Sequence, residues 1–218
     1  MTIAFDLDDT LYDRTQPLRK TLLDFEATRE LPFDHFNKVF QENSVKAFEK
    51  VTKDIWTLEE SYVYRTRKTF EHFGFEMTAS EALHFQERYY QNQQKIELFP
   101  HITEILDFLH EKKIRTIIIT NGPTPQQRIK VENLGLNRYF TPEEVMVSSE
   151  EEAAKPDETW YVGDSYIHDI VGASNAGWKT VWFNHNNQIA DEKSGVQPTK
   201  TVTSTYELKK FLLNLIDQ

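Results

Sequence analysis

The chain has 218 residues, enough for one ordinary domain or for a core domain with a smaller insert. Its 35 acidic residues outnumber its 25 basic ones, which excludes a general nucleic-acid binder because no surplus cation neutralises phosphates. No cysteine is present, so disulfides, thiolate metal sites and a cysteine nucleophile are excluded. No apolar run is long enough to span a bilayer and no basic leader opens the sequence. We therefore expect a cytoplasmic protein that binds neither nucleic acid nor membrane.

The first part of the chain predicts one strand followed by a helical insert. Residues 3–5 form a short apolar run that fits a buried strand. From about residue 15 to 95, apolar residues recur at three- and four-residue spacing, which predicts four or five helices and no strand. Thr57-x-x-Glu60 and Thr78-x-x-Glu81 are predicted capping boxes that open two of these helices.

Beyond residue 100, predicted helices and strands alternate. A helix over 102–109 precedes a β-branched strand at 114–119, and Thr124-Pro125-Gln126-Gln127 predicts a helix start with Gln127 as its capping-box residue. The remaining predicted elements are strands at 145–147, 160–162 and 180–183 and helices at 165–176 and 204–216. This alternation predicts an α/β fold with a doubly wound parallel sheet. Its core would comprise residues 1–14 and 97–218, with residues 15–96 as an inserted helical domain.

Polar functional groups stand where the predicted strands end. Asp6 and Asp8 follow the first strand, Thr120 follows the strand at 114–119, and Asp164 follows the strand at 160–162. Lys155 lies in the loop before that last strand. In an open parallel sheet, ligands bind beyond the carboxyl ends of the strands. Carboxylates that cluster there need a cation between them, and an oxygen-rich pocket suits Mg²⁺. Each residue alone is typical of an Asx turn, a helix cap or a solvated side chain, but their joint order indicates a phosphoryl-transfer site.

Four segments resemble the motifs of the haloacid dehalogenase-like (HAD) superfamily. Residues 5–11 are similar to its first motif, 119–122 to its second, Lys155-Pro156 to its third and 163–169 to its fourth. The helical insert directly after the first motif resembles the cap of the family's first subclass. Phosphoglycolate phosphatases and pyrimidine nucleotidases share that arrangement. The resemblance covers nearly the whole chain and implies a Rossmann-like core with a helical cap.

The resemblance also implies catalytic roles. Asp6 would attack phosphorus and form an aspartyl-phosphate. Asp8 would protonate the leaving alcohol and then take a proton from the hydrolytic water. Thr120 and Lys155 complete the implied catalytic set, Lys155 by pairing with Asp6 and the phosphate. The implied substrate-binding residues are Thr10, Thr120, Asn121, Gly122 and Lys155.

A magnesium site is implied in the same way. Asp6, the carbonyl oxygen of Asp8 and Asp164 would hold Mg²⁺, and Asp169 would support those ligands. The cation would screen the anionic nucleophile from an anionic substrate.

We therefore expect a Mg²⁺-dependent phosphatase, a monomer or homodimer, that acts on a small phosphorylated metabolite such as a sugar phosphate or a nucleotide. An acid at Asp8 favours a phosphate ester, because the superfamily's dehalogenases generally lack a carboxylic acid there. Two alternatives stay open. One is a phosphomutase of the same superfamily, and the other is a noncatalytic member whose cap binds a protein partner.

One connection is shorter than the pattern requires. Residues 149–159 link two predicted parallel strands, whereas such a crossover needs about a dozen or more residues, usually with a helix. Members of the family carry a helix between the positions of Asp157 and Glu158. The chain is naturally short here, shortened by engineering, or longer in the molecule than in the sequence, and its activity depends on which of these holds.

Overall fold

The structure, a computed structural model, describes residues 1–122, 124–147 and 158–217. The chain divides into two compact units. The first, which we call the core unit, comprises Met1–Arg14 and Glu97–Gln218. The second, the helical unit, comprises Thr15–Ile96.

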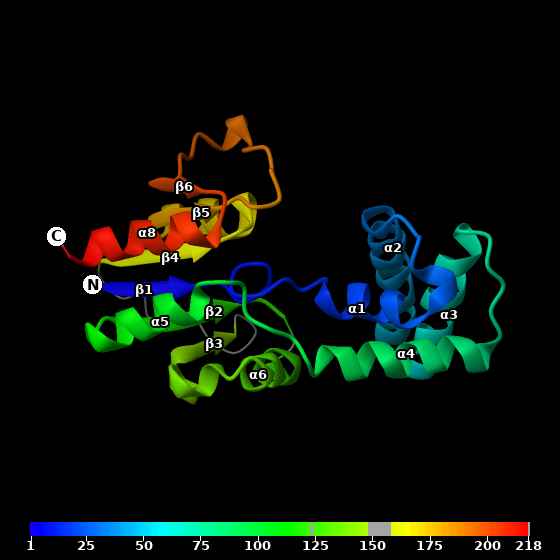
Figure 1. The fold of residues 1–218 in the computed structure, drawn as a ribbon. Coiled ribbons are helices and arrows are strands. Elements are labelled where there is room, and N and C mark those ends of the chain that lie inside the picture. Colours follow the sequence, from blue (N-terminus) through cyan, green and yellow to red (C-terminus); the bar gives the residue numbers. More distant parts are fainter. Residues whose placement is uncertain (123, 148–157, 218) are drawn as a thin grey trace. The chain divides into compact units, whose positions relative to one another are not determined.

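The core unit is built on a six-stranded parallel sheet with the order β3-β2-β1-β4-β5-β6 (Figure 1). The strands are β1 (Thr2–Phe5), β2 (Arg115–Thr120), β3 (Val145–Val147), β4 (Thr159–Gly163), β5 (Lys179–Phe183) and β6 (Lys200–Val202). On one side of β1 lie β2 and then β3, and on the other side lie β4, β5 and β6 in turn. The α/β prediction is confirmed, and the strand order reverses between β1 and β4, the position where such sheets bind ligands.

Helices cover both faces of this sheet. Neighbouring residues of β4 point to opposite faces. The Trp160 ring lies 5.5 Å from Phe211 of α8 (Thr205–Ile216), and the Tyr161 ring stacks at 6.1 Å on Trp178, just after α7 (Gly172–Asn175). The other helices of the core unit are α5 (Ile102–Glu111), which packs beside α8, and α6 (Thr124–Asn133), which contacts β3. Burial on both faces explains why these strands read as continuous apolar runs.

Two elements differ from the sequence prediction. The predicted helix at 165–176 is a π-helical turn, Tyr166–Val171, followed by the short α7. Its wider turn carries Asp169, and π-helical turns are frequent at functional sites. The strand β6 was not predicted, because it has three residues of which only Val202 is buried, so it shows no alternation.

The predicted short crossover lies between β3 and β4, which β2 and β1 separate in the sheet. Residues 148–157, including Lys155 and most of this connection, lie outside the described residues.

The helical unit consists of α1 (Gln16–Asp24), a 3-10 turn (Glu26–Thr28), α2 (Phe33–Thr52), α3 (Leu58–His72) and α4 (Ala79–Gln93). The described residues of this unit contain no strand, as predicted. Both predicted capping boxes are confirmed at the starts of α3 and α4. An aromatic cluster fills the centre, formed by Phe36, Phe40, Phe70 and Phe85. The rings of Phe70 and Phe85 meet edge-to-face at 5.1 Å, a favourable aromatic geometry.

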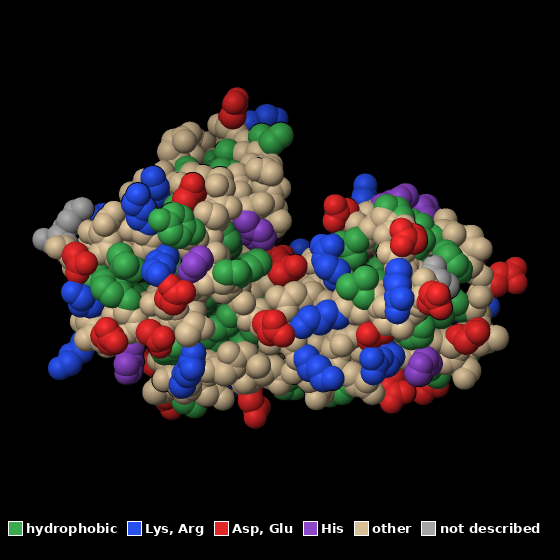
Figure 2. Space-filling model, viewed as in Figure 1, with side chains coloured by type: hydrophobic (Ala, Val, Ile, Leu, Met, Phe, Trp, Pro, Cys, Tyr) green, Lys and Arg blue, Asp and Glu red, His purple; other side chains and the backbone are tan. Residues whose placement is uncertain are grey.

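Charged side chains of both signs are spread over the face that Figure 2 displays. None of the helices in the described part of the chain combines the length and the apolar character that crossing a membrane requires.

The aromatic cluster should dominate the stability of the helical unit. Phe85 is 1% exposed, and Phe85→Ala should lower the free energy of unfolding by about 3–5 kcal/mol, because it opens a cavity. Urea unfolding followed by circular dichroism measures this loss. Phe48, in the same unit, is 61% exposed, so Phe48→Ala should change the free energy by less than about 0.5 kcal/mol. Equal effects of the two variants would contradict the assignment of Phe85 to the core.

Candidate active site

Four polar residues meet at the carboxyl edge of the central strands. Asp6 follows β1, Thr120 ends β2, Asp164 follows β4, and Asp169 comes from the π-helical turn just after β4. Parallel pairing of β1 with both β2 and β4 brings the ends of these three strands to one edge. The site therefore forms where the strand order reverses.

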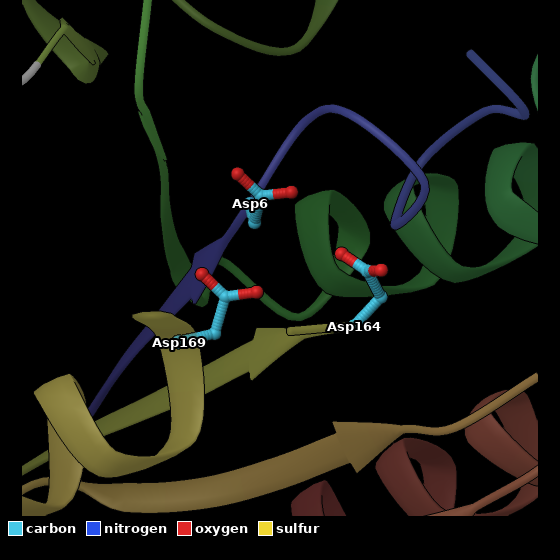
Figure 3. A group of neighbouring side chains, drawn as sticks. All are labelled: Asp6, Asp164 and Asp169. Carbon is cyan, nitrogen blue, oxygen red and sulfur yellow. The ribbon is translucent and has the colours of Figure 1, made fainter. Parts of the chain in front are cut away.

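Asp6, Asp164 and Asp169 form a carboxylate cluster (Figure 3). Each offers one oxygen, and these oxygens all lie within 4.8 Å of one another. Asp6 and Asp169 are buried, and Asp164 is partly exposed. A set of three oxygen donors at this spacing fits a hard divalent cation.

The raised pKa values of the clustered carboxylates also favour a bound cation. Burial raises the pKa of Asp6 well above its ordinary value, and repulsion from Asp169, Asp8 and Asp164 adds to that rise. Burial, with repulsion from Asp9 and Asp169, raises the pKa of Asp164 to about 7. These carboxylates therefore resist full ionisation on their own, and a bound cation would offset the effects of burial and repulsion by stabilising the ionised forms.

Asp169 is held in place by neighbours from its own turn and from β4. Its Oδ2 accepts a hydrogen bond from the Ser165 backbone N–H at 2.8 Å, and its Oδ1 accepts one from the Tyr161 hydroxyl at 3.3 Å. A Cβ at Gly163 would lie 2.5 Å from the Asp169 side chain. Only glycine therefore allows Asp169 to pack against the end of β4.

The Asp8 carboxylate lies outside the cluster and contacts other partners. Lys130 Nζ donates to Oδ1 at 2.8 Å and to Oδ2 at 2.7 Å. Gln127 Nε2 donates to Oδ2 at 3.0 Å, and the Tyr12 hydroxyl donates to Oδ1. Burial pushes the pKa of Asp8 upward, but the Lys130 ammonium and these hydrogen bonds outweigh it and lower the pKa below its ordinary value. Asp6 therefore lies among other carboxylates, whereas Asp8, two residues later, lies among hydrogen-bond donors.

Gln127 does not play the capping role predicted for it. Its Nε2 donates to Asp8 and to the Asn121 carbonyl oxygen, and its Oε1 has no hydrogen-bond partner among the described residues. Lys130, which binds Asp8 from the same helix, was not among the predicted site residues. The signal was available in the spacing, since positions 127 and 130 lie on one face of α6, but a polar helix face is usually solvated.

Two threonine hydroxyls are available for a ligand. Thr10 and Thr120 are almost fully buried, and their Oγ1 atoms have no hydrogen-bond partner within the described ranges. Leaving a buried hydroxyl unpaired costs about 1–3 kcal/mol, so an oxygen of a bound anion would satisfy them. Asn121 and Gly122 follow Thr120 directly, whereas Lys155 lies outside the part of the chain that the structure describes.

Comparison with known proteins agrees with this geometry. The family model of haloacid dehalogenase-like hydrolases matches residues 1–177. The chain is 28% identical to the pyrimidine 5'-nucleotidase YjjG of Escherichia coli (strain K12) over 232 aligned positions, covering 96% of each chain. It is also 28% identical to the glyceraldehyde 3-phosphate phosphatase of Methanothermobacter thermautotrophicus over 233 positions, covering 96% of this chain and 98% of that protein. Both alignments exceed the 218 residues of this chain, so these relatives carry residues that it lacks.

A solved structure supports the fold. The magnesium-bound HAD-hydrolase YfnB of Bacillus subtilis superposes with a TM-score of 0.64 at 21% identity, covering 97% of each chain.

Stability should depend on pH and on a divalent cation together. The pKa of Asp164 is raised from 3.8 to about 7 in the folded protein. Protonation of Asp164 therefore contributes to the free energy of unfolding in full below pH 3.8, and this contribution is lost as the pH rises to about 7. Mg²⁺ binds the ionised cluster, so it should raise the melting temperature by about 3 °C or more near pH 8 and by less near pH 5. Differential scanning calorimetry measures both shifts.

Asp164→Asn should abolish most of this magnesium response. Asp191→Asn is the matched control, because Asp191 caps a short turn on the surface and asparagine caps equally well. A magnesium shift that persists in Asp164→Asn would contradict the assignment of the cluster.

Gly163→Ala should displace Asp169, because the new Cβ would lie 2.5 Å from that side chain. We expect it to weaken the magnesium response at least tenfold in midpoint concentration, a typical loss for an outer ligand-supporting group. Gly172→Ala is the control, since no atom lies within 4 Å of a Cβ there. Thermal titration with Mg²⁺ compares the two, and an unchanged midpoint in Gly163→Ala would refute this role of the glycine.

Proposed function

The chain belongs to the haloacid dehalogenase-like hydrolases, and on that premise we propose that it is a Mg²⁺-dependent phosphatase for small phosphate monoesters. The main observation in support of the proposal is that two nearby carboxylates, those of Asp6 and Asp8, have different surroundings. Asp6 lies in a buried carboxylate cluster, and Asp8 is held by hydrogen-bond donors just outside it. Displacement of an alkoxide from phosphorus uses a nucleophile and, separately, a group that gives a proton to the leaving oxygen.

The proposed reaction has two halves. An oxygen of Asp6 bonds to phosphorus while the ester P–O bond breaks, and Asp8 gives a proton to the leaving oxygen. In the second half, Asp8 takes a proton from water, the water oxygen bonds to phosphorus, and the bond from phosphorus to Asp6 breaks. Inorganic phosphate leaves and both carboxyl groups return to their starting states. Thr120, whose buried hydroxyl ends β2, would donate to the phosphoryl group.

We propose Mg²⁺ as the cation because all donors in the cluster are oxygens and Mg²⁺ prefers few carboxylates plus substrate phosphate. Asp6 and Asp164 would hold it with the Asp8 carbonyl oxygen, and Asp169 would support them. When bound, the cation would supply charge that screens the Asp6 nucleophile from the phosphate dianion.

Asp8 separates this proposal from carbon–halogen cleavage. An alkoxide leaving group needs a proton, whereas a halide does not. The three side chains that donate to the Asp8 carboxylate keep an acid–base group beside the nucleophile, which only an ester substrate would use. The named functions of the similar nucleotidase and triose phosphatase support a small phosphorylated metabolite as substrate.

The helical unit, Thr15–Ile96, is proposed as the cap whose residues select the substrate. Its own compact aromatic core would let it move as a rigid body, and closure over the site would exclude bulk water.

Hydrolysis of p-nitrophenyl phosphate tests the proposal. We expect turnover with millimolar Mg²⁺, none with EDTA, and a fall in kcat of about 1000-fold or more in Asp6→Asn, because the amide is not a nucleophile. Asp6→Asn should also raise the metal-free melting temperature, since it removes one charge from a self-repelling cluster. The exposed variant Asp191→Asn should retain full activity. Activity of Asp6→Asn within tenfold of wild type, about 1.4 kcal/mol of barrier, would exclude Asp6 as the nucleophile.

A panel of substrates then identifies the class. Nucleoside monophosphates, glyceraldehyde 3-phosphate and glycerol phosphate cover the chemistry of the named relatives, and kcat/KM ranks them.

A further inference from the structure

We propose that Lys130 and Gln127 of α6 are positioning residues that orient the Asp8 carboxylate for its proton transfers. This inference rests on the proposed function, because it takes Asp8 as the acid–base group of a phosphatase.

The contacts of Asp8 leave its carboxylate little freedom to rotate. Lys130 Nζ bridges its two oxygens at 2.8 and 2.7 Å. Gln127 Nε2 donates to Oδ2 at 3.0 Å, and the Tyr12 hydroxyl donates to Oδ1. Because each oxygen has at least two donors, any rotation of the carboxylate breaks several charge-assisted hydrogen bonds at once. The carboxylate is thereby held in one orientation.

The inward face of α6 has the composition of a site rather than of a packed core. Gln127, Lys130 and Val131 lie three and four residues apart on one face of the helix. Gln127 is 2% exposed and Val131 is 3% exposed. A helix that served only to pack against the sheet would place apolar side chains at these positions. The contacts with Asp8 explain why a glutamine and a lysine stand there instead.

Gln127 also ties Asp8 to the loop that follows β2. The same Nε2 that donates to Asp8 donates to the Asn121 carbonyl oxygen. A Cβ at Gly122 would lie 2.7 Å from that nitrogen, and Gly122 has φ of +138°, a conformation that favours glycine. The glycine therefore admits Gln127 between the two segments, and the loop after β2 and Asp8 are positioned together.

Stability alone does not account for the ion pair. The side chains of Lys130 and Asp8 are 29% and 22% exposed, and partly exposed pairs contribute little to the free energy of folding. The position of the pair, two residues from the nucleophile, matters more than its strength.

The experiment compares two esters that differ in their need for a proton. A glycerol phosphate alkoxide needs one to leave, whereas p-nitrophenolate leaves readily without it. In Lys130→Met we expect kcat to fall about 100-fold on glycerol phosphate and about tenfold or less on p-nitrophenyl phosphate, with KM changed by less than about threefold. Gln127→Met should show the same contrast more weakly. Lys130→Arg should recover most of the loss, because guanidinium also bridges a carboxylate.

The controls lie on the same helix. Arg128→Met is the control for Lys130→Met, because each removes one positive charge. Gln126→Met is the control for Gln127→Met, because each replaces a glutamine. Arg128 and Gln126 are both exposed. Both control variants should keep wild-type kcat on both esters.

Three outcomes would overturn the inference. Equal loss on both esters with a raised KM would make Lys130 a phosphate-binding residue. Full activity in both Lys130→Met and Gln127→Met would make the contacts structural only. An Asp8 carboxylate with the same orientation in crystal structures of wild type and Lys130→Met, both without substrate, would show that Lys130 does not position it. The crystal structures decide the question even if wild type hydrolyses neither ester, a result that would refute the proposed function instead.

Discussion

The central physical constraint in this protein is the mutual repulsion of carboxylates at the carboxyl edge of the sheet. Asp6, Asp164 and Asp169 each bring an oxygen within 4.8 Å of the others, and burial raises the pKa of each of the three. Such an arrangement is unfavourable unless protons or a cation neutralise it. The rest of the core unit is organised to hold these groups together in spite of that cost.

The fold holds them through backbone geometry more than through side-chain contacts. Parallel pairing of β1 with β4 places Asp6 and Asp164 at adjacent strand ends. The π-helical turn then returns Asp169 to the same edge, where the Ser165 backbone N–H and the Tyr161 hydroxyl bind it. Gly163 leaves the space that Asp169 occupies. Together these features form a site whose charge repulsion a bound cation would relieve.

The contrast between Asp6 and Asp8 shows how neighbouring residues acquire different chemistry. Asp6 is surrounded by other carboxylates, which raise its pKa. The side chain of Asp8 contacts Lys130, Gln127 and Tyr12, and these donors lower its pKa despite burial. The donors around Asp8 favour its ionised form, which is the form that takes a proton from water in the second half of the proposed reaction. The proposed positioning role of α6 starts from these contacts of Asp8, which Asp6 does not share.

The amino-acid sequence alone predicts the fold class, most of the helices and strands, and the acidic residues of the site. Apolar periodicity, capping boxes and residues at strand ends are local signals, and β1 to β5 and the capped helices α3 and α4 carry them clearly. The resemblance at the four motifs also implied that Asp6, Asp164 and Asp169 share a site, but the hydrogen-bond partners of each carboxylate are visible only in the folded protein. Asp169 joins the cluster through a π-helical turn, and Lys130 reaches Asp8 across 122 residues of chain. Contacts between residues so far apart depend on how the strands pair and where α6 packs, and no local pattern in the sequence encodes them.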